Sequence, residues 1–105
     1  MIRYTTPTFK LYIYKNDKTV YDMSFVKDGL VVFTQNEKKV IEKPLSECEI
    51  EKNAIKVFLS QTETGLFSVG NAEIQAILNN KDGTVFATTP RLVMVKKILS
   101  EKVFE

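Results

Sequence analysis

The sequence predicts an all-β fold, a single β-sandwich of about seven to eight antiparallel strands that occupies residues 1–105. Three observations lead to this class. Turn-forming residues recur every 8–12 positions or so, and the runs between them alternate apolar and polar residues. These intervals leave little room for a long helix. The turn signals are at 5–7, 15–17, 27–29, 35–39, 52–53, 59–67, 79–83 and 88–90. The ends, about 1–6 and 100–105, are expected to be flexible.

The predicted strands of the N-terminal half cover 8–14, 20–26 and 30–34. Each of the first two alternates in the way expected of a half-buried strand. Asp28 and Gly29 form a dipeptide typical of hairpin turns, which predicts a turn before the third strand. The apolar positions of the first two strands that share a face are Phe9, Leu11, Ile13, Tyr21, Met23 and Phe25.

Four further strands are predicted at 47–51, 54–59, 71–78 and 84–88. In the first of these, alternation would place Glu47, Glu49 and Glu51 on a solvated face and Cys48 with Ile50 on a buried one. The Asp82-Gly83 pair predicts the hairpin turn before the last of them. The apolar positions that share a face in the second and third are Ile55, Val57, Leu59, Ala72, Ile74, Ala76 and Leu78.

The final segment, RLVMVKKILSEKVFE, fits two structures. Leu92, Val95, Leu99 and Val103 would form an apolar stripe on a helix. However, the segment follows Pro90 and begins with β-branched residues, which favours a strand over 91–98 and then a short tail. We therefore expect a strand here, with a helical end as the alternative.

The stretch LSQTETGLF, residues 59–67, is the polar segment that most resembles a catalytic or phosphate-binding loop. A serine or threonine nucleophile beside Glu63 would need an activating base, and the chain has no histidine. Ser60 and Glu63 instead match the capping-box pattern, which predicts a short helical turn near residues 60–65. We interpret this stretch as a corner between two strands.

Composition excludes several classes of site. With no histidine and one cysteine, Cys48, histidine-based catalysis is excluded and a structural zinc site is close to excluded. Cys48 lies between two glutamates, which disfavour its thiolate, so a small core residue is expected there. Three glutamates on one exposed face do not form an opposed catalytic pair. We therefore predict no enzyme activity and no catalytic, cofactor-binding or metal-binding residue.

The charge and hydropathy patterns indicate which classes of partner the chain is not expected to bind. The 15 basic and 13 acidic residues are interspersed and give a net charge of +2, so we expect no nucleic-acid partner. No apolar run approaches the ~20 residues of a membrane-spanning helix, and no signal-peptide core follows Met1, so we expect no membrane partner. A lone cysteine fits synthesis in a reducing cytoplasm.

A candidate interaction surface is formed by Lys10, Tyr12 and Tyr14, which share the outer face of the first predicted strand, with Tyr4 as an additional member. This composition fits three roles. The side chains could pack in the core or at a sheet edge, contact another protein, or stack on a base or sugar. The last role leads to an alternative function, a carbohydrate- or cell-surface-binding adhesion module.

Four stretches carry a resemblance to a known group: TPTFKLYIY, IKVFLSQTETGLF, AEIQAIL and DGTVFATTPRLVMVKKIL. Together they resemble small prophage-encoded proteins of Firmicutes, which are similar to the immunoglobulin-like N-terminal domain of phage baseplate upper proteins. The resemblance implies an immunoglobulin-like sandwich with a tail- or baseplate-associated role. It implies protein partners, either further copies in a homo-oligomer or other phage structural proteins. It also implies synthesis in the bacterial host cytoplasm, with the virion as a further location, and no catalytic residue.

Overall fold

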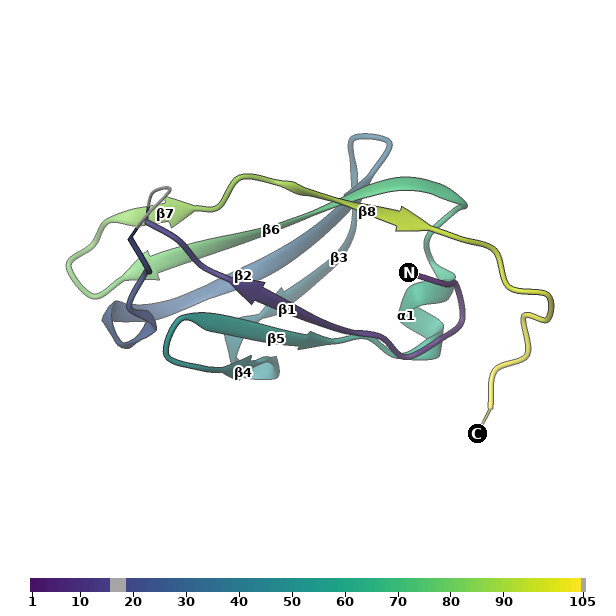
Figure 1. Cartoon of the computed structure of the whole chain (residues 1–105), viewed down its shortest axis with the longest axis horizontal. Coiled ribbons are helices and arrows are strands. Elements are labelled where there is room, and N and C mark those ends of the chain that lie inside the picture. The colour runs from purple at the N-terminus through teal and green to yellow at the C-terminus, as the bar shows by residue number, and fades with distance from the viewer. Residues whose placement is uncertain (16–18, 105) are drawn as a thin grey trace.

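A computed structural model describes residues 1–15 and 19–104 (Figure 1). Within these residues the chain forms eight strands in two antiparallel sheets. The smaller sheet has the order β1 (Thr8–Tyr12), β5 (Ala54–Phe58), β4 (Glu49–Ile50). The larger has the order β3 (Lys38–Pro44), β2 (Val26–Gln35), β6 (Gly70–Asn80), β7 (Val85–Ala87), and β8 (Arg91–Val95) also pairs with β6. The predicted all-β sandwich is confirmed.

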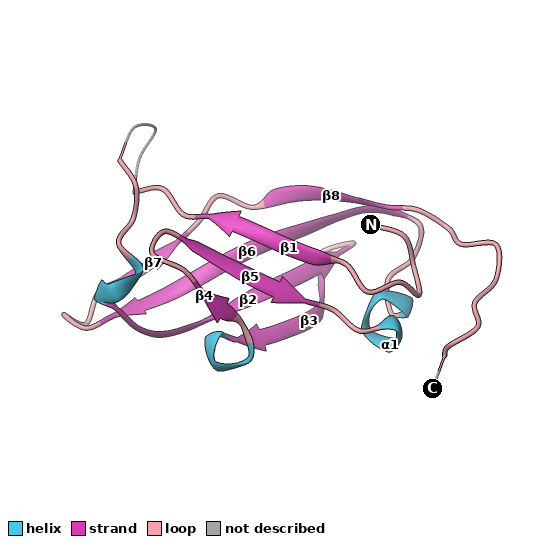
Figure 2. Cartoon of the chain, turned by 60° about the horizontal axis from the view of Figure 1, so that its bottom comes forward, coloured by secondary structure: helices cyan, strands magenta, loops and turns pink. Residues whose placement is uncertain are grey.

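Three short helical elements connect the strands. They are the 3-10 helices η1 (Met23–Phe25) and η2 (Leu45–Glu47) and the one-turn helix α1 (Gln61–Gly65). Of these, α1 is the turn predicted near residues 60–65. It joins β5 of the smaller sheet to β6 of the larger one (Figure 2).

The two sheets enclose one apolar core, and Phe33 of β2 lies in its middle with no exposed surface. Its ring meets Phe9 of β1 edge to face at a centroid distance of 5.5 Å and Phe67 at 5.9 Å. Because Phe9 belongs to the smaller sheet and Phe33 to the larger, this contact ties the two layers together. The alternation predicted for β5 and β6 is confirmed by the buried side chains Ile55, Val57, Leu59, Ala72, Ile74, Ala76 and Leu78.

The strand predicted over 20–26 is wrong. Tyr21 and Met23 are buried as expected, but Phe25 is 46% exposed, because the chain there forms the 3-10 helix η1. The side chain of Asp22 explains this local structure, since its Oδ1 accepts hydrogen bonds from the amide and the hydroxyl of Ser24 at 2.9 and 2.8 Å. Such a side-chain bond offers the backbone an alternative to strand pairing.

The hairpin turn predicted at Asp28-Gly29 is also wrong, because both residues lie inside β2. Gly29 pairs with Leu78 of β6, and a register shift precedes it between Val26 and Asp28. A Cβ added at Gly29 would lie 2.4 Å from the carbonyl oxygen of Ile77. Glycine is therefore needed here for the close approach of β6 rather than for a turn.

The prediction for residues 47–51 is only partly right. β4 contains just Glu49 and Ile50, and Ile50 is 44% exposed instead of buried. Cys48 is half-buried at the margin of the core. Glu51 does not stand alone on a solvated face, because its carboxylate lies 3.1 Å from the Nζ of Lys10 and 3.3 Å from that of Lys56. The physical reason is that β4 is a two-residue edge strand with β5 on one side only.

The other predicted turns agree with the structure where it describes them. Asn36 and Glu37 both have positive φ (53° and 64°), as a tight hairpin turn between β2 and β3 requires. Gly83 has φ of 89° in the turn between β6 and β7. The turn predicted at 15–17 falls mostly outside the described residues.

The last strand, β8, ends at Val95, three residues earlier than predicted. The residues after it, 97–104, form neither strand nor helix, so the helical alternative is wrong. The first residues of the chain run parallel to the end of β8. The amine of Met1 donates to the Met94 carbonyl at 2.7 Å, and the amide of Arg3 donates to the Lys96 carbonyl at 3.0 Å. The chain therefore extends the larger sheet before it crosses to the smaller sheet as β1.

Candidate interaction groove

The 60–65 corner is held by the capping box that its sequence predicts. The Oγ of Ser60 accepts a hydrogen bond from the amide of Glu63 at 3.1 Å, and the Oε1 of Glu63 accepts one from the amide of Ser60 at 2.9 Å. The second carboxylate oxygen of Glu63 lies 2.9 Å from the Nζ of Lys43. The ring of Tyr4 covers Gly65 so closely that a Cβ there would lie 2.4 Å from its Cε1. Ser60, Glu63 and Lys43 are thus bonded to one another and hold the corner itself.

The Glu63 carboxylate gives the corner a pH dependence. Burial alone would raise its pKa, but the bonds from Lys43 and Ser60 outweigh burial and hold the pKa below its ordinary value of 4.5. A carboxyl whose pKa is lowered by folding stabilises the fold above its ordinary pKa, and this contribution is lost as the pH falls through the lowered pKa.

Replacing Glu63 with glutamine is therefore expected to lower the free energy of unfolding near neutral pH, and by less at acid pH. Urea unfolding of both proteins at intervals from about pH 6 to about pH 3 measures the difference. Lys43→Met removes the partner of the carboxylate and should reduce the pH dependence in the same direction. If the free energy of unfolding changed with pH in the same way for the wild type and Glu63→Gln, this would contradict the role given to the carboxylate.

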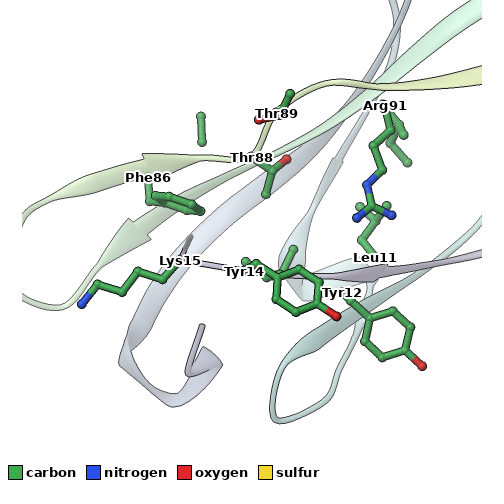
Figure 3. A pocket seen from close by; sticks show the side chains of 11 residues that line it. Leu11, Tyr12, Tyr14, Lys15, Phe86, Thr88, Thr89 and Arg91 are labelled. Carbon is green, nitrogen blue, oxygen red and sulfur yellow. The ribbon is translucent and has the colours of Figure 1, made fainter. Parts of the chain in front are cut away.

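An open groove of about 490 Å³ lies between β1 of the smaller sheet and the segment from β7 to β8 of the larger (Figure 3). Its floor consists of the apolar side chains Leu11, Ile13, Ile74 and Phe86. One rim carries Tyr12, Tyr14 and Lys15, and the other carries Thr88, Thr89 and Arg91. Figure 3 shows Arg91 reaching from β8 toward β1. The groove therefore marks the side of the sandwich where the edges of the two sheets are not joined.

The strand that borders this groove has one free edge. The amide of Ile13 donates to the carbonyl of Asn53, and the amide of Leu59 donates to the carbonyl of Pro7, so alternate residues of β1 point toward β5. In an antiparallel pair the residues between them point the other way. The backbone groups of Thr8, Lys10 and Tyr12 therefore point away from β5, and no strand among the described residues pairs with them.

The four residues of the candidate surface predicted from the sequence do not all lie together in the structure. Tyr12 and Tyr14 are 44% and 46% exposed at the groove rim. The Nζ of Lys10 lies 5.1 Å from the ring centroid of Tyr12 and 3.1 Å from the Oε1 of Glu51. The hydrogen bond that Lys10 donates to Glu51 raises the pKa of Lys10. Tyr4 is not part of this surface, because its ring lies against Gly65 of α1.

Sequence reasoning did not find the opposite wall of the groove. Phe86, Thr88, Thr89 and Arg91 lie more than seventy positions after β1. Residues 88–90 gave only a turn signal, and no local pattern shows that this turn lies beside Tyr14. Among the described residues, neither Arg91 nor Lys15 makes an ion pair, and none of those that line the groove is acidic.

A neighbouring hollow of about 600 Å³ is a weaker candidate site. Its polar groups already bond one another. The hydroxyl of Tyr21 donates to the Oδ1 of Asn80 at 2.5 Å, and the hydroxyl of Thr84 donates to the Oδ1 of Asp82 at 2.6 Å. Because these bonds hold the β6–β7 hairpin, they leave few groups for a ligand.

The described residues show no other chemical site. Across 1–15 and 19–104, no three cysteine or carboxylate side chains converge as metal ligands. Burial raises the pKa of the Cys48 thiol, an effect that nearby Lys43 opposes without cancelling. None of the helices in this part of the chain is long and apolar enough to span a membrane. Comparisons with protein-family models, curated proteins and solved structures find no match to this chain.

Proposed function

We propose that this chain is a non-enzymatic interaction domain of a phage or prophage particle, tail- or baseplate-associated, that acts through protein–protein contacts. The observation that carries the interaction role is the free edge of β1 beside an apolar groove with exposed Tyr12 and Tyr14. The particle, its immunoglobulin-like domain and its location in the virion are supported by the sequence resemblance described above.

The mode of binding is strand addition. An extended segment of the partner pairs with the outward backbone groups of Lys10 and Tyr12, and every second side chain of that segment reaches the apolar floor of the groove. Backbone hydrogen bonds supply part of the affinity, at about 0.5–1.5 kcal/mol each. The tyrosine rim excludes water around them, as aromatic residues do at protein interfaces.

A proline at position 12 tests this mode. Tyr12→Pro removes the outward amide, and proline is tolerated on a free strand edge because that amide has no partner in β5. Tyr12→Thr also removes the ring but keeps the amide and suits a strand. We expect the products of the flanking genes, co-expressed with the chain, to co-purify with the wild type and Tyr12→Thr and to be lost with Tyr12→Pro.

Two results would contradict the proposal. Equal co-purification with Tyr12→Pro would exclude strand addition at β1. Flanking genes that encode no phage structural protein would remove the support for a particle. Circular dichroism of the three proteins serves as the control that the proline leaves the sandwich folded.

The alternative, a carbohydrate- or cell-surface-binding adhesion module, is favoured by one arrangement. The rings of Tyr12 and Tyr14 stand on one rim of the groove, and the side chains of Thr88, Thr89 and Arg91 stand on the other. Aromatic faces with polar groups opposite them suit a sugar ring. On a glycan array this function predicts binding that is lost with Tyr12→Thr, the substitution that strand addition tolerates.

A further inference from the structure

We propose that the groove of one copy binds the segment 98–104 of a second copy as an added strand on β1, which joins the copies head to tail. This inference rests on the proposed role of β1 and names its partner. It begins from two features of the same chain, each without a counterpart among the described residues. One is the groove with its free strand edge, and the other is the segment after β8.

The segment after β8 forms neither strand nor helix, bends at Leu99 and exposes several of its apolar side chains. Leu99 is 96% exposed and Phe104 71% exposed, the first more so than any other large apolar side chain in the described residues. Among the described residues, polar contacts of Glu101 and Phe104 connect the segment to the rest of the fold. The Arg3 side chain bonds Glu101 at 3.1 Å, and the amide of Phe104 donates to the Oε1 of Gln61 at 2.9 Å. Burial of these apolar groups would contribute about 25 cal/mol per Å².

The side-chain pattern of the segment fits the groove. In an extended backbone Leu99, Glu101 and Val103 lie on one side, so a carboxylate stands between two apolar groups. The groove offers an apolar floor with Arg91 and Lys15 on its rims, and none of the described residues that line it is an acid. The lengths also agree, because residues 11–15 line the groove and residues 99–103 cover the same five positions at ~3.3 Å per residue.

We place the contact between copies because the segment begins away from the groove of its own chain. Residues 1–3 occupy the outer edge of β8 from Met94 to Lys96, where the segment begins, and the groove is lined by Arg91 at the other end of that strand. The segment leaves the sandwich on the side of α1, at the end opposite to β7 (Figure 1), whereas the groove is lined by Phe86 to Thr89 at and after β7. A groove that receives the segment of the next copy is a heterologous contact, which produces closed rings or open chains.

Complementation between two variants tests the proposal. Leu99→Asp disables the segment, because its carboxylate would face the apolar floor while the rim cations are taken by Glu101. Tyr12→Pro disables the groove. We expect the wild type to form larger species with rising concentration in sedimentation velocity and light scattering. Each variant alone should associate roughly tenfold or more weakly. A mixture of the two should form one-to-one dimers, since one copy keeps the groove and the other keeps the segment.

The control is Leu66→Asp, the same chemical change at another exposed leucine, which should associate like the wild type. The inference is overturned if Leu99→Asp associates like the wild type, if the mixture stays monomeric, or if the wild type is monomeric at every concentration. None of these results decides the role of β1 toward other proteins, which the co-purification with Tyr12→Pro measures separately. Circular dichroism confirms that each variant is folded.

Discussion

Replacing Phe33 with alanine is expected to lower the free energy of unfolding by about 3–5 kcal/mol. The side chain has no exposed surface, and its ring contacts Phe9 of the smaller sheet and Phe67 after α1. Truncation would leave a cavity between the two sheets that neither can fill without moving. Because domains of this size are stable by about 5–15 kcal/mol, the variant should lie near the limit of folding. The midpoint of urea unfolding measures the loss.

Phe58→Ala is the matched control for this prediction. Phe58 lies on β5 but points outward and is 46% exposed, so the same chemical change should cost about 1 kcal/mol or less. Similar losses at the two positions would show that the enclosed ring of Phe33 does not hold the sheets together.

The second large effect is expected at Gly29. Gly29→Ala should lower the free energy of unfolding by about 3 kcal/mol, the upper part of the usual range for added volume in a packed site. The new Cβ would lie 2.4 Å from the carbonyl oxygen of Ile77 and 3.2 Å from the Cα of Leu78, and both are backbone atoms that rotamer changes cannot move. Alanine recovers about 0.5–1 kcal/mol of chain entropy, which is too little to compensate.

Lys27→Ala, on the exposed side of the same strand, serves as the control and should change stability by about 0.5 kcal/mol or less. Thermal unfolding of both variants against the wild type measures the contrast. A Gly29→Ala protein as stable as the wild type would mean that β6 does not approach β2 as closely as described.

Much of the fold could be predicted from local pattern, because several elements depend on local chemistry. The alternation of β5 and β6 defines which side chains are buried, and Ser60 with Glu63 defines the corner between the sheets. The prediction failed where contacts with a distant strand, and not the local sequence, determine the backbone conformation. Asp28-Gly29 has the composition of a turn, yet β6 keeps it in a strand, and nothing near Gly29 in the sequence reveals that β6 lies beside it.

Only one wall of the groove could be predicted from the sequence. Alternation along residues 8–14 was enough to place Tyr12 and Tyr14 on an outer face, and both are exposed. Which strand ends lie opposite depends on the sheet order, so Phe86 and Arg91 were missed, and Tyr4, named as an additional member of the surface, has its ring against Gly65 instead of at the rim. Pairings between residues this far apart are properties of the topology, which a single sequence does not display.

The pairing of β2 with β6 also determines how the protein must be assembled during synthesis. Residues 26–34 pair with 73–80, so a loop of about forty residues must close before the larger sheet gains its central ladder. Proteins dominated by such distant pairings fold on the millisecond-to-second scale. A ribosome must translate beyond residue 80 before this ladder can form. The first residues can pair only later still, because Lys96, the partner of Ile2, is synthesised after residue 80.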